Sequence, residues 1–316
     1  MTREITVVAV LGLSYSGSTI LNYVLGAHPA IYGGGEVHAL LTKYNGANYC
    51  TNCQGACPHW TPENLAKVNE KDFYAFIASL FGTSVVVDTS KTWNWFDRST
   101  RFPSSVPLKF VPVVIIKHPL RHLSSFMVNT MSQKLGNDAI RDLYVRHWLN
   151  PDEALAASPQ FAINKASLRR KMIDWYLDFL VRQNVELFEH VDTVFPGNPY
   201  TLVRYENLAH DRAGELAPLL SHLGLQFHPG MDDCYATEHH DIGGNAGASY
   251  QVHRNDAYFE GSHDIRKEFY RNVRGITVDN KYLKFFTPEE VEMLQQDERL
   301  TRLMRAFMYE PLPASA

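Results

Sequence analysis

The chain has 316 residues, of which 45% are hydrophobic and 20% are charged, and its formal net charge is −4. A chain of this size can bury a large core, and it lacks the basic balance that a general nucleic-acid binder needs. It has no apolar run of about 18 residues, the length of a membrane span, and its start does not resemble a secretory signal peptide. Its four cysteines are too few for a secreted disulfide scaffold. We therefore expect a cytoplasmic protein with no membrane and no nucleic-acid partner.

Strands and helices are expected to alternate along the chain. Residues 5–11 form a nearly continuous run of apolar, β-branched side chains, which predicts a strand buried on both faces. Further short buried strands are predicted at residues 85–88, 111–117 and 200–205. Helical patterns cover residues 19–27, 64–81, 121–135, 168–190, 206–223 and 288–307. This alternation predicts an α/β fold with a P-loop-like, doubly wound parallel sheet flanked by helices, and ligands beyond the carboxyl ends of the strands.

Two segments interrupt the alternation. Residues 43–60 are rich in Asn, Gly and Cys, and residues 131–165 are polar and broken by prolines. Long excursions of this kind often form lids or binding loops. We expect one domain over residues 1–316, with both insertions over the active site as acceptor pocket or lid. In the second insertion the expected pocket residues are Tyr144, His147 and Trp148.

A glycine-containing loop joins the first predicted strand to the first predicted helix. Gly12 and Gly17 are spaced as in a P-loop, where backbone N–H groups and a helix N-terminus bind an anion. Ser18 stands where a P-loop NTPase needs Lys to hold the β and γ phosphates beside magnesium. The serine argues against hydrolysis of ATP or GTP and favours an anion that needs no metal. The alternative is a plain turn whose glycines serve backbone geometry alone.

Further short motifs follow the loop in a fixed order. They comprise Ala27-His28-Pro29, Gly35-Glu36, Lys117-His118-Pro119-Leu120-Arg121 with Ser125, Val203-Arg204-Tyr205-Glu206-Asn207-Leu208, Leu223-Gly224-Leu225, Gly243-Gly244-Asn245 and Ile276-Thr277-Val278-Asp279. Together with the loop from Gly12 to Leu21, they resemble the motifs of sulfotransferases that use 3′-phosphoadenosine 5′-phosphosulfate (PAPS). The similarity is greatest to the bacterial small-molecule enzymes and the tyrosylprotein sulfotransferases.

This resemblance implies in-line transfer of the sulfuryl group of PAPS to a hydroxyl or amine of a small-molecule acceptor, such as a specialised metabolite. PAP is then the product, and no metal is required. It implies that the 5′-phosphosulfate is held by Tyr15, Ser16, Gly17, Ser18 and Thr19. It implies that the 3′-phosphate is held by Lys117, Arg121 and Ser125. Other candidate nucleotide contacts are the aromatic rings of Tyr205 and Trp93, which could stack on adenine, and the guanidinium groups of Arg271 and Arg274. Tyr205 could equally be a core residue.

Sulfuryl transfer needs a base for the acceptor proton and a cation at the leaving oxygen. Glu36 follows three glycines and matches the catalytic glutamate of the tyrosylprotein relatives, so it is the candidate base; His38 is the second candidate. Many relatives carry Lys or Arg just before the Ser-Gly of the loop, where this chain has Tyr15. We therefore assign the cation to Lys91, after the second predicted strand. The alternatives are a helix N-terminal glutamate and a surface lysine.

Cys50, Cys53, Cys57 and His59 have the spacing of zinc ligands, but no second half of such a motif exists elsewhere. Structural zinc, a disulfide and free thiols all stay open, and none of them would be catalytic. The stretch from His239 to Asp241 offers further metal-ligand side chains, although such a stretch more often forms hydrogen-bonded structure.

Two other functions stay open: a P-loop nucleotide kinase or NTPase, and a protein that binds PAP or PAPS without catalysis. A homodimer is compatible with the sequence.

Overall fold

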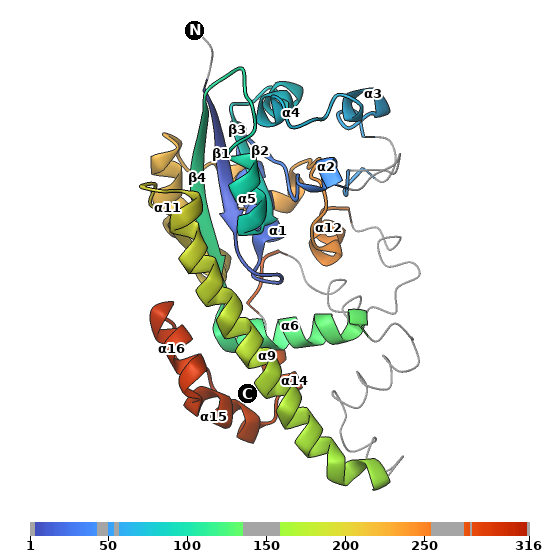
Figure 1. Ribbon diagram of the computed structural model, residues 1–316, viewed down its shortest axis with the longest axis vertical. Helices are drawn as coiled ribbons and strands as arrows, with labels where there is room; N and C mark the ends of the chain where they lie inside the picture. The colour runs from blue at the N-terminus through green and yellow to red at the C-terminus, as the bar shows by residue number, and fades with distance from the viewer. Residues whose placement is uncertain are drawn as a thin grey trace. The chain divides into compact units, whose positions relative to one another are not determined.

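The computed structural model describes residues 4–42, 50–53, 57–134, 159–253, 275–278 and 280–314 (Figure 1). The chain divides into two compact units. The first comprises Met1–Ile116 and Leu187–Thr277, and the second comprises Lys117–Glu186 and Val278–Ala316. Each unit is described by itself. The single domain that we expected over residues 1–316 stays a prediction.

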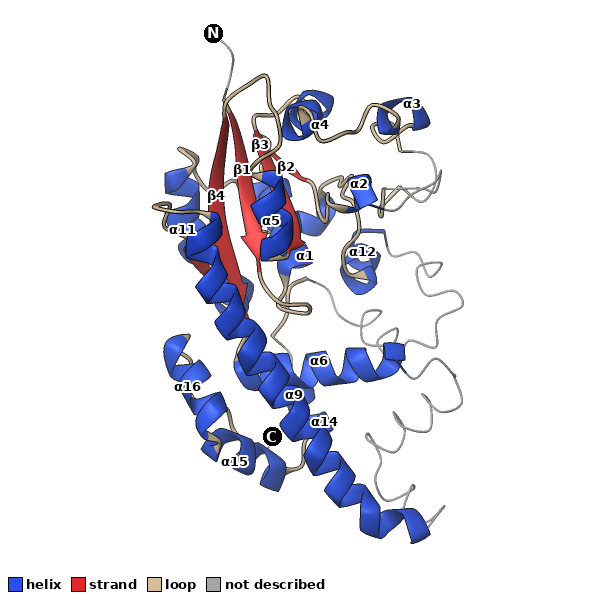
Figure 2. Ribbon diagram, in the orientation of Figure 1, coloured by secondary structure: helices blue, strands red, loops and turns tan. Residues whose placement is uncertain are grey.

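The first unit contains a five-stranded parallel sheet (Figure 2). Its order is β2-β3-β1-β4-β5, and its strands are β1 (Ile5–Leu11), β2 (Ile31–Gly33), β3 (Val85–Lys91), β4 (Leu108–Ile116) and β5 (Thr201–Arg204). Strand β1 lies at the centre because its apolar side chains can be buried on both faces. The predicted α/β fold with a parallel sheet is confirmed, and the loop after β1 lies at the carboxyl edge of the sheet.

Helices pack their apolar faces on this sheet. Helix α1 (Ser18–Gly26) contacts β2 and β3, and α4 (Phe73–Phe81) contacts β1 and β3. Leu21, Val24 and Leu25 of α1 are fully buried, and burying each such side chain stabilises the fold by about 1.5–3 kcal/mol. The other helices of this unit are α2 (Ala39–Thr42), α3 (Pro62–Leu65), α5 (Trp93–Ser99), α10 (Tyr205–His210), α11 (Arg212–His222), α12 (Ala246–His253), the 3-10 turns η1 (Pro229–Met231) and η2 (Cys234–Ala236), and the end of α9 (Pro159–Val194).

In the first unit, two predicted helices are each split in two. The helix predicted over residues 64–81 is wrong in its middle, because α3 ends at Leu65 and α4 begins only after Asp72, which has a left-handed φ of 58°. The helix predicted over residues 206–223 breaks at Asp211. The side chain of Asp211 accepts a hydrogen bond from the backbone N–H of Gly214 and so starts α11.

The second unit is helical over its described residues. It comprises α6 (Pro119–Lys134), the first part of α9, α14 (Lys281–Phe285), α15 (Pro288–Gln296) and α16 (Glu298–Ala306). Thr287 and Glu290 form a capping box at the start of α15. The predicted last helix breaks at Asp297, whose side chain caps α16. The proposed pocket residues Tyr144, His147 and Trp148 lie outside the described residues.

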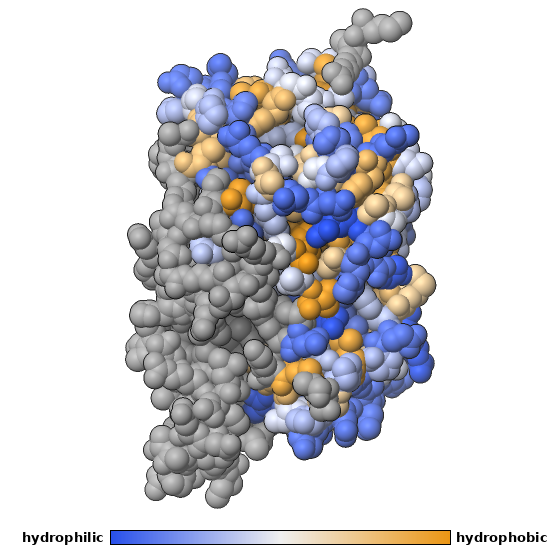
Figure 3. Space-filling model, turned by 180° about the vertical axis from the view of Figure 1, so that it is seen from behind, coloured by the Kyte–Doolittle hydropathy of each residue, from blue (hydrophilic) through white to orange (hydrophobic). Residues whose placement is uncertain are grey.

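The surface mixes polar and apolar side chains. On the face drawn in Figure 3, hydrophilic residues surround smaller hydrophobic patches. The large hydrophobic side chains exposed in the described part of the chain are Trp175, Val185, Tyr200 and Met308. Within the described ranges, no helix has both the length and the hydropathy to cross a bilayer.

Candidate active site

The glycine loop after β1 has a backbone that only particular residues tolerate. Gly17 adopts a left-handed φ of 104°, and a Cβ there would overlap the ring of Tyr205, with Cε2 at 3.0 Å. A Cβ at Gly12 would lie 2.9 Å from the carbonyl oxygen of Ile115. Tyr15 also has a positive φ, of 69°. Such strained conformations concentrate at binding and catalytic sites.

The loop fits an anion. Gly17, the N-cap of α1, provides no side-chain cap, and the first turn holds no acidic residue, so the free N–H groups of the helix end favour a negative ligand. The hydroxyl of Ser16 is fully buried and has no hydrogen-bond partner among the described residues. A buried hydroxyl without a partner is costly, so a ligand oxygen there would satisfy it. Ser18 and Thr19, which follow in the sequence, are also buried.

Glu36 is fixed by its own backbone and that of its neighbour. The N–H of Gly35 donates to Oδ1 of Asn22 at 3.0 Å, and the N–H of Glu36 donates to the carbonyl oxygen of Ile242 at 2.6 Å. Asn22 is a fully buried amide on α1, so the helix that follows the glycine loop also positions Glu36. The sequence contained a signal for this role, since Asn22 is an amide within the otherwise apolar run from Ile20 to Leu25.

Lys91 lies at the carboxyl end of β3, directly beside the loop. Its carbonyl oxygen accepts a hydrogen bond from the N–H of Gly12 at 3.4 Å, and its own φ is 69°. Its ammonium group forms an ion pair with the Glu36 carboxylate. The side chains are only 16% and 27% exposed, so the pair is partly shielded from water. The structure thus brings together the two residues to which we assigned the cation and the base.

A buried network holds the end of β3 in place. Asp88 accepts hydrogen bonds from the hydroxyl of Tyr74 at 2.8 Å and from Nε1 of Trp95 at 2.7 Å. Burial raises the pKa of Asp88. The hydroxyl of Ser90 donates to Asp88 at 2.5 Å and accepts from the backbone N–H of His38 at 3.2 Å. The backbone of His38, the second candidate base, is thereby tied to β3.

The ring of His38 keeps one nitrogen unsatisfied. Its Nδ1 is buried and has no hydrogen-bond partner among the described residues, and the ring is tilted against Trp95 with centroids 6.0 Å apart. Its role as a base stays a prediction.

Residues 241–245 close this site from another part of the chain. The N–H of Asn245 donates to the hydroxyl of Thr19 at 3.1 Å, and a Cβ at Gly243 would lie 3.3 Å from Cβ of Glu36. Asp241 is fully buried, and this burial raises its pKa to about 7. The Gly243-Gly244-Asn245 motif stands out in the sequence, whereas nothing there points to Asp241 as part of this site.

The two aromatic candidates have partners within the first unit. The ring of Tyr205 packs on Gly17, and its hydroxyl donates to the carbonyl oxygen of Thr277 at 3.0 Å. Trp93 stacks on His190, with ring centroids 3.9 Å apart. Stacking of either ring on adenine stays a prediction.

In the second unit, two of the predicted 3′-phosphate residues contact each other. Nζ of Lys117, which is buried, donates to the hydroxyl of Ser125 at 3.0 Å. The guanidinium of Arg121 donates to Oδ1 of Asn280 at 3.0 Å. Phosphate binding by these residues stays a prediction. Arg271 and Arg274 lie outside the described residues.

The cysteines of the first insertion form a cluster with a histidine. The group comprises Cys50, Cys53, Cys57 and His240, and all three cysteines are free thiols. His59, the fourth ligand candidate from the sequence, is not part of the group. Its ring packs against the rings of Phe81 and His240, with centroids 4.6 Å and 4.7 Å away, but it supplies no ligand atom to the group.

Comparison with known proteins identifies the fold. No protein-family model and no curated protein matches this chain. Two solved structures are similar over almost the whole chain. The sulfotransferase domain of the Synechococcus PCC 7002 olefin synthase is 16% identical with a TM-score of 0.50, and the match covers 99% of this chain and 96% of that domain. The sulfotransferase domain from the curacin biosynthetic pathway is 14% identical with a TM-score of 0.49, covering 99% and 100%. The first likeness shows that this chain has the fold of a sulfotransferase domain.

Proposed function

We propose that the protein is a sulfotransferase that moves the sulfuryl group of PAPS to a hydroxyl or amine of a small-molecule acceptor. The observation that carries this proposal is the Glu36–Lys91 ion pair, which stands beside a glycine loop that has Ser18 in place of the P-loop lysine. The loop offers an anion site, and the pair offers a base and a cation next to it. The fold of a sulfotransferase domain supports the same activity.

The donor would be held by the loop. PAPS supplies an activated sulfuryl group, bound to the phosphate oxygen that leaves. The N–H groups at the start of α1 and the hydroxyl of Ser16 can hold the oxygens of the phosphosulfate. Because no lysine occupies the loop, positive charge for the leaving oxygen comes from Lys91 at the end of β3.

Glu36 and Lys91 would divide the proton and charge transfers. As the acceptor oxygen or nitrogen forms its bond to sulfur, the bond between sulfur and the phosphate oxygen breaks. The acceptor proton passes to the Glu36 carboxylate, and the leaving oxygen keeps the bonding electron pair. Lys91 stabilises the negative charge that develops there. The ion pair holds the Glu36 carboxylate and the Lys91 ammonium group side by side, next to the loop.

Radiolabelled PAPS and a panel of hydroxyl and amine acceptors test the proposal. We expect transfer by the wild type and a loss of about 10²–10⁴-fold in Glu36→Gln, because the base is removed while the shape is kept. Lys91→Met should lose activity in the same way. The exposed Glu63→Gln and Lys109→Met are matched controls and should transfer at the wild-type rate. Undiminished transfer in both Glu36→Gln and Lys91→Met would contradict the assignment.

The same preparation separates the other two functions. Calorimetric titration with PAP measures donor binding without turnover. Tight PAP binding without transfer to any acceptor would favour a binding protein that lacks catalysis. Turnover of ATP that depends on magnesium would favour a nucleotide kinase or NTPase instead.

A further inference from the structure

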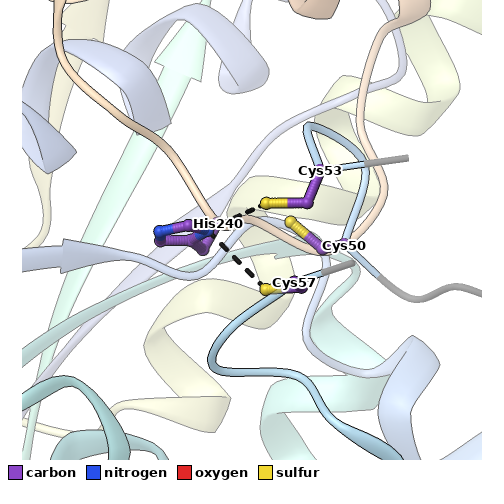
Figure 4. A group of neighbouring side chains, drawn as sticks. All are labelled: Cys50, Cys53, Cys57 and His240. Carbon is purple, nitrogen blue, oxygen red and sulfur yellow. Dashed lines mark hydrogen bonds between the residues drawn. The ribbon is translucent and has the colours of Figure 1, made fainter. Parts of the chain in front are cut away.

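Three thiols and one imidazole converge on a common centre in the first unit. The ligand atoms of Cys50, Cys53, Cys57 and His240 all lie within 4.8 Å of one another. Nδ1 of His240 lies 3.1 Å from Sγ of Cys53 and 3.6 Å from Sγ of Cys57. Figure 4 shows the four side chains pointing toward one another. A tetrahedral zinc with Zn–S bonds of about 2.3 Å keeps its ligand atoms about 3.5–3.8 Å apart, so shifts of about 1 Å or less would place these four around one ion.

We infer that Cys50, Cys53, Cys57 and His240 bind a structural zinc ion. Three thiolates with one imidazole are an established donor set for structural zinc, and four protein ligands leave no position open for substrate. The thiolates are soft ligands, which argues against magnesium or calcium. Cys50 and Cys57 are buried, and Cys53 is partly buried, so the centre is largely shielded from bulk water.

The surroundings orient the ligands as in a metal centre. Nε2 of His240 lies 3.3 Å from a carboxylate oxygen of Glu238, and metal-binding histidines commonly donate their second ring N–H to such a group. The backbone N–H of Trp60 donates to Sγ of Cys57 at 3.3 Å. The indole of Trp60 and the hydroxyl of Tyr32 each donate to the carbonyl oxygen of His240 at 2.8 Å. These contacts fix the ring and the backbone of His240 as well as the thiol of Cys57.

The zinc would join two chain segments that support Glu36. Cys50 forms an isolated antiparallel bridge with Ile242, and Ile242 forms a parallel bridge with Gly35. The backbone N–H of Thr51 donates to the carbonyl oxygen of Asp241 at 3.0 Å. An ion that holds residues 50–53 against His240 therefore also holds Ile242, whose carbonyl oxygen accepts the hydrogen bond from the backbone N–H of Glu36. The metal site stands without the proposed function; only its expected effect on transfer depends on it.

Metal analysis of the purified full chain tests the inference. We expect about one zinc per chain in the wild type, measured by mass spectrometry of the elements. His240→Gln and Cys53→Ser should lose the zinc. Two matched controls should keep it. His59→Gln removes a histidine whose ring packs against Phe81 and His240 but which supplies no ligand atom, and Cys234→Ala removes the buried cysteine that lies outside the cluster.

Cobalt substitution keeps the test decisive if a variant does not fold. Wild-type protein stripped of metal and loaded with Co²⁺ should show the visible absorption of tetrahedral cobalt and thiolate-to-cobalt charge transfer. A chelator should lower the unfolding temperature of the wild type but not that of His240→Gln. Two results would overturn the inference. One is wild-type protein that is isolated without zinc and whose cluster thiols react fully with iodoacetamide. The other is zinc that is retained in both His240→Gln and Cys53→Ser. Zinc content without any sulfuryl transfer would leave the metal site standing and refute only the proposed function.

Discussion

Replacing Gly35 by alanine tests how closely the backbone holds Glu36. Gly35 has a left-handed φ of 73°, and an added Cβ would overlap the carbonyl oxygen of Ile242 and lie 2.9 Å from its nitrogen. These are backbone atoms that cannot rotate away. Gly82 offers a matched control, because its φ is 66° and no described atom lies within 4 Å of an added Cβ. The two variants share the backbone strain and differ in the collision.

The structure sets the size of each effect. Alanine in the left-handed region costs about 1–2 kcal/mol, and both variants carry this cost. Gly35→Ala must also push apart two backbone segments, and overpacking of this kind costs about 1–3 kcal/mol. We therefore expect Gly35→Ala to lower the free energy of unfolding by about 2–5 kcal/mol and Gly82→Ala by about 1–2 kcal/mol. The displacement should also break the hydrogen bond from the Glu36 N–H to the carbonyl oxygen of Ile242.

Urea unfolding and a transfer assay provide the two measurements. The free energy of unfolding from the urea titration gives the stability difference between the variants. The rate of sulfuryl transfer at saturating donor shows whether Glu36 has moved. We expect Gly82→Ala to transfer like the wild type and Gly35→Ala to be strongly impaired. Equal stability losses in the two variants would refute the reasoning, because the collision with Ile242 would then carry no cost.

Three further outcomes follow from individual side chains. Ser16→Ala should weaken PAP binding by about 0.5–1.5 kcal/mol in a calorimetric titration, yet leave thermal stability unchanged, because this buried hydroxyl has no partner among the described residues. Tyr74→Phe should lower the free energy of unfolding by about 1–3 kcal/mol in urea, because Asp88 loses a buried donor. Burial lowers the pKa of His28 below 6.5, so the folded state resists its protonation and stability should fall as the pH drops below about 6.5. His28→Asn should show a smaller loss between about pH 7 and 5 in thermal melts, whereas the exposed His222→Asn should match the wild type.

Much of the sheet could be predicted because buried parallel strands have distinctive sequences. The apolar runs of β1 and β4 were located within a few residues. Strand β2 was missed, since three residues ending in glycine carry no measurable period. The helix breaks at Asp211 and Asp297 had a signal in the sequence, because aspartate favours the N-cap of a following helix. The apolar periodicity continued across both breaks and concealed them.

The cysteine cluster illustrates what spacing cannot give. Sequence proximity favoured His59 as the fourth member, only two residues after Cys57. The structure supplies His240 instead, 187 residues beyond Cys53. No local pattern predicts such a pairing, because it depends on the fold that brings residues 240–243 back beside Gly35. The motif match made Glu36 a candidate, and Tyr15 in place of the loop cation made Lys91 one. Neither could show that the two side chains form an ion pair.

The ion pair depends on one irregularity in the sheet. Strands β1 and β3 pair in regular register as far as Ala9 and Asp88, and continuing that register would place Ser90 beside Leu11. An extra residue on β3 instead places Lys91 beside Leu11, at the start of the glycine loop. Bulges re-aim side chains in this way, and the φ of 69° at Lys91 belongs to the same distortion. In the proposed function, Tyr15 leaves the loop without its usual cation, and Lys91 beside the loop supplies the positive charge. The bulge is the local feature that brings a lysine from the neighbouring strand to that place.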